Sequence, residues 1–338
     1  MPDTPLLLSG RGVRRVLTAA LGALAGVTVV ASPARAGVGV GEVTEYPITT
    51  AADSSPAGIT TGPDRALWFT ESGAGGRIGR MATDGTLTDY PTPSSDSAPF
   101  GITPGPDGAL WFTETGTGRI GRITTGGRIT EFALPSADSG PAWIALGADG
   151  ALWFTETGTG RIGRITTSGR ITEYAVPTPD GHPYGIAAGP DGALWFTELL
   201  AGKVGRISLT GRVTEFPLGA DDFPDDIVAG PGGMWVTASG TNSVDRISRT
   251  GRVTRFPLPH PDSGPSGITR GPDGRVWFIE QSGRIGGVTA TGAITEFPVP
   301  VGAGKVPFRL TAGPDRAVWF TELLGNAVGR MQALPHGL

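Results

Sequence analysis

Short runs of apolar and β-branched residues alternate with clusters of glycine and small polar residues along most of this chain. One full copy of the pattern, residues 142–183, contains four such runs. The clusters between the runs include Asp-Gly and Ser-Gly steps, which supply the positive φ angles of hairpin turns without a Cβ penalty. No copy shows a sustained apolar period of 3.6 residues, so we expect helices to be almost absent. The pattern predicts a sheet of four short antiparallel strands.

The four-run pattern occurs seven times, each time marked by Trp-Phe-Thr-Glu or a close variant. The tryptophans of these phrases lie 40 to 43 residues apart, at Trp68, Trp111, Trp153, Trp195, Trp235, Trp277 and Trp319. A fixed period of this length indicates one supersecondary unit copied in tandem. Four antiparallel strands per unit are typical of a β-propeller blade, and seven blades close into a ring. The sequence therefore predicts an all-β fold, a seven-bladed β-propeller of four-stranded antiparallel blades.

The two ends of the repeat array complement each other. The last copy stops after its third run, residues 327–332, and lacks a fourth. Residues 41–48, ahead of the first copy, resemble the fourth run of every other copy. We therefore predict that the N-terminal strand completes the last blade and closes the ring without an open strand edge.

The first 36 residues do not belong to the repeat. Arg11, Arg14 and Arg15 precede an uncharged stretch of 16 residues, and Ala34-Arg35-Ala36 follows as a small-residue cleavage site. These three parts are typical of an export signal peptide, and the Arg14-Arg15 pair is compatible with twin-arginine export. A membrane anchor is disfavoured because the apolar stretch is short and rich in small residues. We expect residues 1–36 to be a signal peptide and residues 37–338 to form one secreted, monomeric propeller domain.

Composition excludes several function classes. The formal net charge is −4 for the whole chain and −7 without the four Arg and one Asp of residues 1–36, and no Lys/Arg run is present. A nucleic-acid partner is therefore not expected, and no membrane association is expected after signal cleavage. The chain has no cysteine, which excludes disulfides, thiol catalysis and Cys/His zinc sites. No nucleophile elbow or phosphate-binding glycine loop is present, since the glycines follow the repeat as turns.

Candidate site residues gather on one predicted face of the ring. Each innermost strand enters through a Pro-X-Gly-Ile type step, and the second strand returns to end at the Glu of Trp-Phe-Thr-Glu, so both sets lie on the same face. The X residues are Ala57, Phe100, Ala142, Tyr184, Asp225, Ser266 and Phe308, and the acidic set is Glu71, Glu114, Glu156, Glu198, Glu280 and Glu322. The carboxylates could hold a divalent cation, or each could pair with the Arg or Lys that begins the next strand. The hairpin after Glu280 is two residues shorter than the others, which singles this residue out.

The repeat phrases resemble the virginiamycin B lyase (streptogramin B lyase) family. They include Gly105-Pro-Asp-Gly-Ala-Leu-Trp-Phe-Thr-Glu, Arg119-Ile-Gly-Arg-Ile-Thr and Ile129-Thr-Glu-Phe, and the resemblance covers essentially all of residues 42–332. It implies an enzyme that linearises a cyclic depsipeptide antibiotic without water. In such a lyase a base removes an α-proton, Mg²⁺ assists in stabilising the enolate, and the threonyl oxygen leaves.

The resemblance breaks at the positions that carry chemistry. The family places catalytic histidines at X in two adjacent blades and a tyrosine at X in the next, whereas no X residue here is histidine. If the short hairpin after Glu280 is matched to the family's short hairpin, these positions become Asp225, Ser266 and Phe308. The family's metal-binding glutamate then matches Glu280 or Gln281, and a second family glutamate matches Gly264.

Two hypotheses therefore remain. The first is a lyase-like enzyme with a displaced catalytic set, His182, Tyr184 and Asp225, and a Mg²⁺ ion at Glu280. The second is a non-catalytic secreted propeller that binds a small molecule, peptide or glycan at its central funnel. In both hypotheses the residues expected to contact a small-molecule or cyclic peptide ligand are Phe100, Ser266, Phe308 and Arg309.

Overall fold

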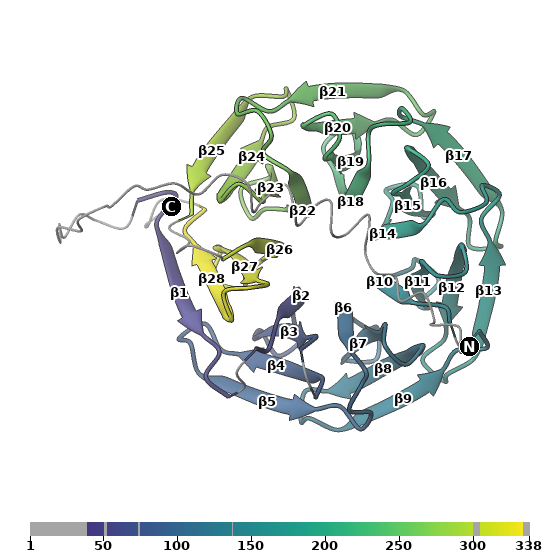
Figure 1. The fold of residues 1–338 in the computed structure, drawn as a ribbon, viewed down its shortest axis with the longest axis vertical. Helices are drawn as coiled ribbons and strands as arrows, with labels where there is room; N and C mark the ends of the chain where they lie inside the picture. Colours follow the sequence, from purple (N-terminus) through teal and green to yellow (C-terminus); the bar gives the residue numbers. More distant parts are fainter. Residues whose placement is uncertain (1–38, 51–52, 74, 137, 300–304, 334–338) are drawn as a thin grey trace, which may run out of the picture. The chain divides into compact units, whose positions relative to one another are not determined.

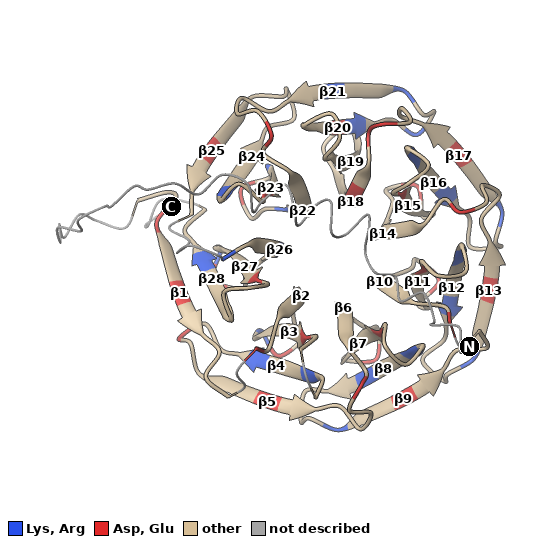
Figure 2. Ribbon diagram, viewed as in Figure 1, with Lys and Arg blue, Asp and Glu red and all other residues tan. Residues whose placement is uncertain are grey.

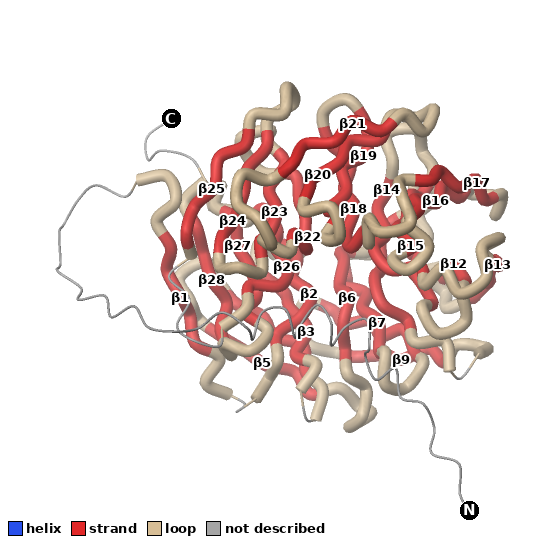
Figure 3. The backbone as a smooth tube through the Cα atoms, turned by 45° about the horizontal axis from the view of Figure 1, so that its top comes forward, coloured by secondary structure: helices blue, strands red, loops and turns tan. Residues whose placement is uncertain are grey.

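The computed structural model describes residues 39–50, 53–73, 75–136, 138–299 and 305–333. These residues form seven four-stranded antiparallel sheets and no helix, as Figures 1 and 3 show. Accordingly, none of them belongs to a helix that could span a membrane. The predicted signal peptide, residues 1–36, lies outside the described residues.

The strands follow one another from the innermost to the outermost position of each blade. Blades 1 to 3 are β2 to β5 (Pro56–Thr61, Leu67–Glu71, Arg77–Met81, Leu87–Pro91), β6 to β9 (Pro99–Pro104, Ala109–Glu114, Arg119–Thr124, Ile129–Ala133) and β10 to β13 (Pro141–Leu146, Leu152–Glu156, Arg161–Ile165, Ile171–Ala175). Blades 4 and 5 are β14 to β17 (Pro183–Ala188, Leu194–Glu198, Lys203–Ile207, Val213–Pro217) and β18 to β21 (Pro224–Gly230, Gly233–Ala238, Ser243–Ile247, Val253–Pro257). Blade 6 is β22 to β25 (Pro265–Arg270, Val276–Glu280, Arg284–Val288, Ile294–Pro298), and blade 7 is β26 to β28 (Pro307–Ala312, Val318–Glu322, Ala327–Met331) with β1 (Val43–Pro47).

The N-terminal strand closes the ring as predicted. Strand β1 pairs antiparallel with β28, from Val43 opposite Met331 to Pro47 opposite Ala327. Figure 1 shows this purple strand as the outer edge of the yellow last blade. Strand β26 of blade 7 also packs against β2 of blade 1, so every innermost strand has a neighbour on both sides.

The tryptophan of each repeat is the centre of its blade's packing. All seven are fully buried, and each stacks on a Tyr or Phe of the outermost strand of its own blade with ring centroids 5.3 to 5.7 Å apart. Between blades, Trp153 of blade 3 packs against Leu194 and Phe196 of blade 4, and similar clusters join the other neighbours. Burying one such side chain contributes about 1.5–3 kcal/mol. The core is therefore distributed around the ring.

A β-bulge at the start of every innermost strand points the site residues toward the axis. In blade 3, Pro141 pairs with Glu156 and Ile144 with Phe154, so three steps on β10 face two steps on β11. The same shift occurs in all seven blades, for example between Pro224 and Ile227 of β18. A bulge of this kind bends the strand and redirects side chains, and bulges are common beside functional sites. The bulge contains X and the residue after it.

The threonine of Trp-Phe-Thr-Glu links this bulge to the next blade by hydrogen bonds. In blade 3 the Thr155 hydroxyl accepts a hydrogen bond from the Trp143 backbone N–H at 3.1 Å and donates to the Tyr184 carbonyl of blade 4 at 2.7 Å. Thr321 makes the equivalent bond to the Ala57 carbonyl at 2.7 Å, which joins the last blade to the first. Blade 6 has Ile279 at this position instead. The repeated threonine thus positions X residues across blade boundaries.

Candidate ligand-binding site

The face that contains the bulges is called the mouth face here, and the opposite face is called the far face. Arg309, the residue after X in blade 7, lies at the ring axis of the mouth face with 3% of its surface exposed. Its Nη2 atom donates to Asp225 Oδ1 of blade 5 at 2.8 Å, and its Nε atom lies 3.6 Å from Asp226 Oδ2. Asp226 in turn accepts a hydrogen bond from the Ile268 N–H of blade 6 at 3.1 Å. These contacts join three successive blades at the axis.

Four aromatic side chains surround this ion pair. The Arg309 guanidinium carbon lies 4.2 Å from the ring centroid of Trp143, 4.5 Å from that of Phe308 and 5.8 Å from that of Tyr184. Phe100 completes the group, with centroid distances of 4.9 Å to Trp143 and 5.9 Å to Phe308. These residues belong to blades 2, 3, 4 and 7, so their contacts cross the axis. The axial cluster, defined as these four aromatic residues with Arg309, Asp225 and Asp226, covers the mouth of the ring with a partly exposed aromatic floor.

The charges within the axial cluster stabilise one another. Burial raises the pKa values of Asp225 and Asp226, and the neighbouring Arg309 guanidinium opposes that rise. Burial also raises the pKa of Tyr184, so its hydroxyl is a neutral phenol at ordinary pH. For Arg309, burial alone would lower the pKa, but the two carboxylates outweigh it and raise it. Arg309 is therefore a permanent cation that is desolvated, held by Asp225 and covered by aromatic faces, an arrangement that favours cation–π contact.

The mouth face also carries exposed apolar residues. Among the described residues, the exposed large hydrophobic side chains are Leu200, Phe223 and Leu324, with 45%, 39% and 58% of their surfaces exposed. Leu200 and Leu324 lie in the hairpins after β15 and β27, and Phe223 directly precedes β18. All three segments belong to the mouth face.

The structure brings together five of the eight site residues predicted from the sequence. They are Phe100, Tyr184, Asp225, Phe308 and Arg309. The Ser266 hydroxyl is buried and makes no hydrogen bond with the described residues. His182 precedes β14 on the same face, in the left-handed region at φ 50°, and its side chain has no recorded hydrogen bond or ion pair within the described part of the chain. Glu280 lies in a different environment, away from the axial cluster.

The repeated glutamates do not pair with the cations that begin the next strand, which corrects one interpretation of the sequence. Arg161 and Lys203 instead bind carboxylates of the outermost strands, Glu173 at 2.7 Å and Glu215 at 2.8 Å. Figure 2 shows this acidic position on β5, β9, β13, β17, β25 and β1, and a basic residue in its place on β21. Burial, with the outer carboxylate second, raises the pKa of Glu71 to about 8 and of Glu156 to about 7. The glutamates therefore form buried pairs of acids within their own blades rather than a ring around the axis.

The Glu280 carboxylate lies among other charged groups. Burial raises the pKa of Glu280, and its neighbour Glu296 already pairs with His260. The Arg284 cation lies near the Glu280 carboxylate. Mg²⁺ requires a near-octahedral set of oxygen ligands, and no group of three or more His, Asp or Glu side chains suited to a metal occurs in the described ranges. Glu280 and Glu296 are two neighbouring carboxylates, and the Mg²⁺ ion expected at Glu280 stays a prediction from the family resemblance.

Sequence reasoning missed Trp143 as part of the site. It is the eighth tryptophan and stands outside the repeated set, directly after X in blade 3, where four other blades have glycine. In those blades a Cβ on Gly58 or Gly185 would approach the X carbonyl of the next blade, which explains the glycine. Trp143, Asp226 and Arg309 are the three departures from glycine at this position, and all three belong to the axial cluster. A comparison of the position after X in all seven blades would have found Trp143 as well.

Comparisons with known proteins agree with this architecture. The profile described as "Virginiamycin B lyase family" matches residues 27–222 and 136–336. Selenomethionine-substituted virginiamycin B lyase from Staphylococcus aureus is 34% identical, with a TM-score of 0.81, and the match covers 87% of this chain and 99% of that one. A structure named streptogramin B lyase is also 34% identical, with 86% and 96% of the two chains covered and a TM-score of 0.80.

A third solved structure carries a ligand in its description. It is a catalytically inactive histidine-to-alanine variant of the Staphylococcus aureus virginiamycin B lyase with quinupristin, again 34% identical, with coverage of 87% and 99% and a TM-score of 0.81. No curated protein sequence matches the chain. The profile match and these structures together show that this chain belongs to the virginiamycin B lyase family.

Proposed function

We propose that this protein is a binding member of the family, which holds a large apolar ligand of the cyclic depsipeptide class on its mouth face without opening it. The observation that carries the proposal is the axial cluster, where Arg309, fastened to Asp225, and four aromatic rings occupy the axis. Trp143, Tyr184 and Phe308 offer partly exposed aromatic surface. Aromatic floors with a few fixed polar groups are typical of small-molecule sites.

The same cluster disfavours proton abstraction. An eliminating enzyme needs a base within hydrogen-bond reach of the proton that it removes. The Asp225 carboxylate is bound by Arg309 at 2.8 Å, and the Tyr184 phenol is a poor base because burial raises its pKa. The His182 side chain has no hydrogen bond or ion pair with either of them in the described part of the chain. Asp225 and Tyr184 are therefore not set up as bases, and His182 has no hydrogen-bond partner among the described residues that would orient its imidazole.

A lyase with a rearranged site is the second candidate. It is favoured by 34% identity over almost the full length of the Staphylococcus aureus enzyme. In this case Asp225 would act as the base, since burial raises its pKa toward the working range of a general base. Arg309 would then have to release Asp225 when the substrate binds. We further propose that residues 1–36 direct export, so that the propeller meets its ligand outside the cell.

Calorimetry and chromatography with quinupristin separate the two candidates. The purified protein is titrated with quinupristin, and the same mixtures, with and without Mg²⁺, are incubated and separated by chromatography with mass detection. Elimination gives a linear isomer of unchanged mass, whereas hydrolysis adds one water. The binding proposal predicts heat of binding and an intact ring.

Two variants locate the binding. Trp143→Ala should weaken binding, whereas Arg170→Ala, an exposed residue of a far-face turn, should leave it unchanged. Ring opening by the purified protein would establish the lyase instead. A titration without heat, or equal affinities of the two variants, would refute binding on the mouth face.

A further inference from the structure

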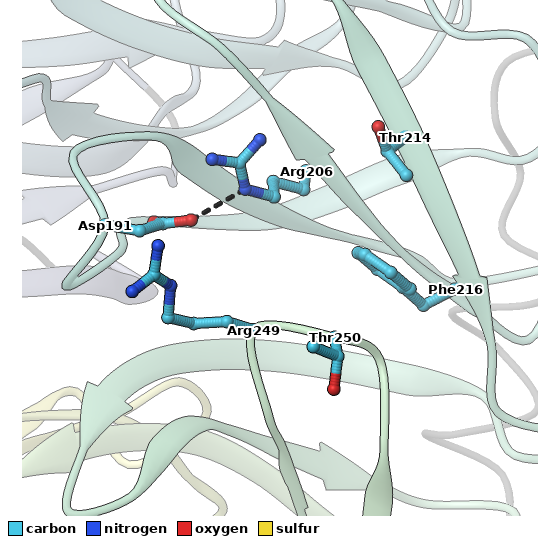
Figure 4. A pocket seen from close by; sticks show the side chains of 6 residues that line it. All are labelled: Asp191, Arg206, Thr214, Phe216, Arg249 and Thr250. Atoms are coloured by element: carbon cyan, nitrogen blue, oxygen red, sulfur yellow. Dashed lines mark hydrogen bonds and ion pairs between the residues drawn. The ribbon is translucent and has the colours of Figure 1, made fainter.

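A pocket of about 490 Å³ lies on the far face between blades 4 and 5 (Figure 4). It is lined by Asp191, Arg206, Thr214, Phe216, Arg249 and Thr250. The first four residues belong to blade 4, and the last two come from the turn between β20 and β21 of blade 5. The pocket is therefore on the face opposite the axial cluster, and its chemistry is independent of the proposed function.

The blade 4 wall of this pocket is a repeated and rigid arrangement. Arg206 Nε donates to Asp191 Oδ2 at 2.7 Å, and Trp195 Nε1 donates to Asp191 Oδ1 at 3.1 Å. Phe216 stacks on the same tryptophan with centroids 5.4 Å apart. Burial opposes ionisation of Asp191, but these hydrogen bonds outweigh it and lower its pKa. The Nη atoms of Arg206 have no recorded partner among the described residues, so the guanidinium retains donors for a ligand.

The blade 5 wall differs from its counterparts in charge. The turn residue equivalent to Arg249 is Thr83, Thr125, Thr167, Leu209 or Ala290 in the other blades whose turns are described. Among the described turns, only that of blade 5, which faces the cleft between blades 4 and 5, has a cation at this position. Arg249 is exposed and has no recorded ion pair or hydrogen bond from its side chain to a described residue. In Figure 4 its guanidinium extends toward Asp191 from the side opposite Arg206.

The charges of the pocket favour an anion. Two guanidinium groups face one carboxylate, Asp191, which is already bound by Arg206 and Trp195, so one positive charge remains uncompensated. Guanidinium groups recognise carboxylate and phosphate through parallel N–H donors. The Thr214 hydroxyl adds a further donor, the Thr250 hydroxyl is shared with Ser248 at 3.0 Å, and Phe216 adds an apolar wall. A volume of about 490 Å³ exceeds the needs of a bare anion and falls in the range of small-molecule sites.

We propose that this far-face pocket binds a small organic oxyanion, a carboxylate or phosphate monoester that carries a ring or another apolar group. The oxyanion lies between the guanidinium groups of Arg206 and Arg249, and the apolar group lies against Phe216. Six quasi-equivalent clefts share the Phe or Tyr wall, but the described turns that face them lack the arginine. The arginine at position 249 therefore distinguishes this cleft from the others and creates the site.

Titration calorimetry at low ionic strength tests the site with phenyl phosphate, benzoate and inorganic phosphate as probes. We expect one site per chain, with phenyl phosphate or benzoate bound more tightly than inorganic phosphate because of the Phe216 wall. Arg249→Ala should weaken binding about tenfold, since it removes charge-assisted hydrogen bonds. The matched control is Arg252→Ala, which removes the same charge from an exposed residue three positions away and should change the affinity less than about twofold.

A gain-of-function variant completes the test. Thr167→Arg places an arginine in the equivalent turn of blade 3, where Gly169 packs on Phe132 as Gly251 packs on Phe216. This variant should raise the stoichiometry from one to two. Equal losses in the Arg249 and Arg252 variants would show that only net charge matters and would overturn the proposal. Failure of all three probes to bind would overturn it as well.

Discussion

Replacing Glu156 with glutamine should stabilise the protein at about pH 8 and change its stability little at about pH 4. The Glu156 side chain is fully buried, and only its Oε2 atom accepts a hydrogen bond, from Thr159 at 3.0 Å. The nearby Arg161 binds Glu173 instead, so the charged form of Glu156 is left without a direct cationic partner. Burial, with Glu173 second, accordingly raises the Glu156 pKa from 4.5 to about 7.

The sign and size of the effect follow from the difference between the pKa of a free glutamate, 4.5, and the pKa of Glu156 in the folded protein, about 7. A carboxyl whose pKa is raised in the folded state stabilises the fold while it is protonated, and this contribution is lost as the pH rises from about 4.5 to about 7. At about 1.4 kcal/mol per pKa unit, the ionised group costs about 3 kcal/mol above that window. This is an upper limit, because Arg161 can turn from Glu173 toward Glu156. Glutamine keeps the shape and cannot ionise, so the variant avoids the cost.

Urea denaturation of both proteins at about pH 4 and about pH 8 measures the difference. We expect the variant to have a higher urea midpoint than the wild type at about pH 8, and the two proteins to have the same midpoint at about pH 4. Glu42→Gln, which removes the same charge from an exposed position, is the matched control and should be neutral at both values. Blade 5 is a natural precedent, because it has Ala238 in place of this glutamate. A variant that is less stable than the wild type at about pH 8 would refute the reasoning.

Three further changes test the axial cluster, the threonine links and the closure of the ring. Arg309→Met should destabilise the protein by about 3–5 kcal/mol, because it leaves the Asp225 carboxylate without its cation. In urea denaturation, the double variant with Asp225→Asn should recover much of this loss of stability. A double variant that recovers none of it would contradict the pairing. Thr155→Val should cost about 1–3 kcal/mol, since the Trp143 N–H and the Tyr184 carbonyl lose their partner, and an unchanged urea midpoint would show that the link is dispensable. Deletion of residues 39–47 should expose the β28 edge and cause association, which light scattering would detect; a monomer of unchanged melting temperature would argue against closure by β1.

The sequence determines the fold because each level of the pattern repeats. Trp-Phe-Thr-Glu, the Asp-Gly turns and the period of 40 to 43 residues all indicate the same blade, and the missing fourth strand of the last copy indicates closure. The closure prediction is confirmed by the pairing of Val43 with Met331. Local rules suffice there, since each blade repeats the same contacts.

The site could be predicted only in part. The X positions identify Phe100, Tyr184, Asp225 and Phe308 because the strand direction places them on one face. Arg309 of blade 7 pairs with Asp225 of blade 5, although blade 6 lies between these blades in the ring. No local rule predicts which side chains meet across the axis. The pairing of Arg161 with Glu173 instead of Glu156 depends on the outermost strand. The spacing of residues along the chain does not show which of these two carboxylates Arg161 binds.

The most direct test of the proposed function is a crystal structure of the protein soaked with quinupristin. The account predicts an intact macrocycle on the mouth face, in contact with Trp143 and Tyr184, while Arg309 remains bound to Asp225. A linear product, or a ligand that occupies the axis with Arg309 displaced from Asp225, would contradict it.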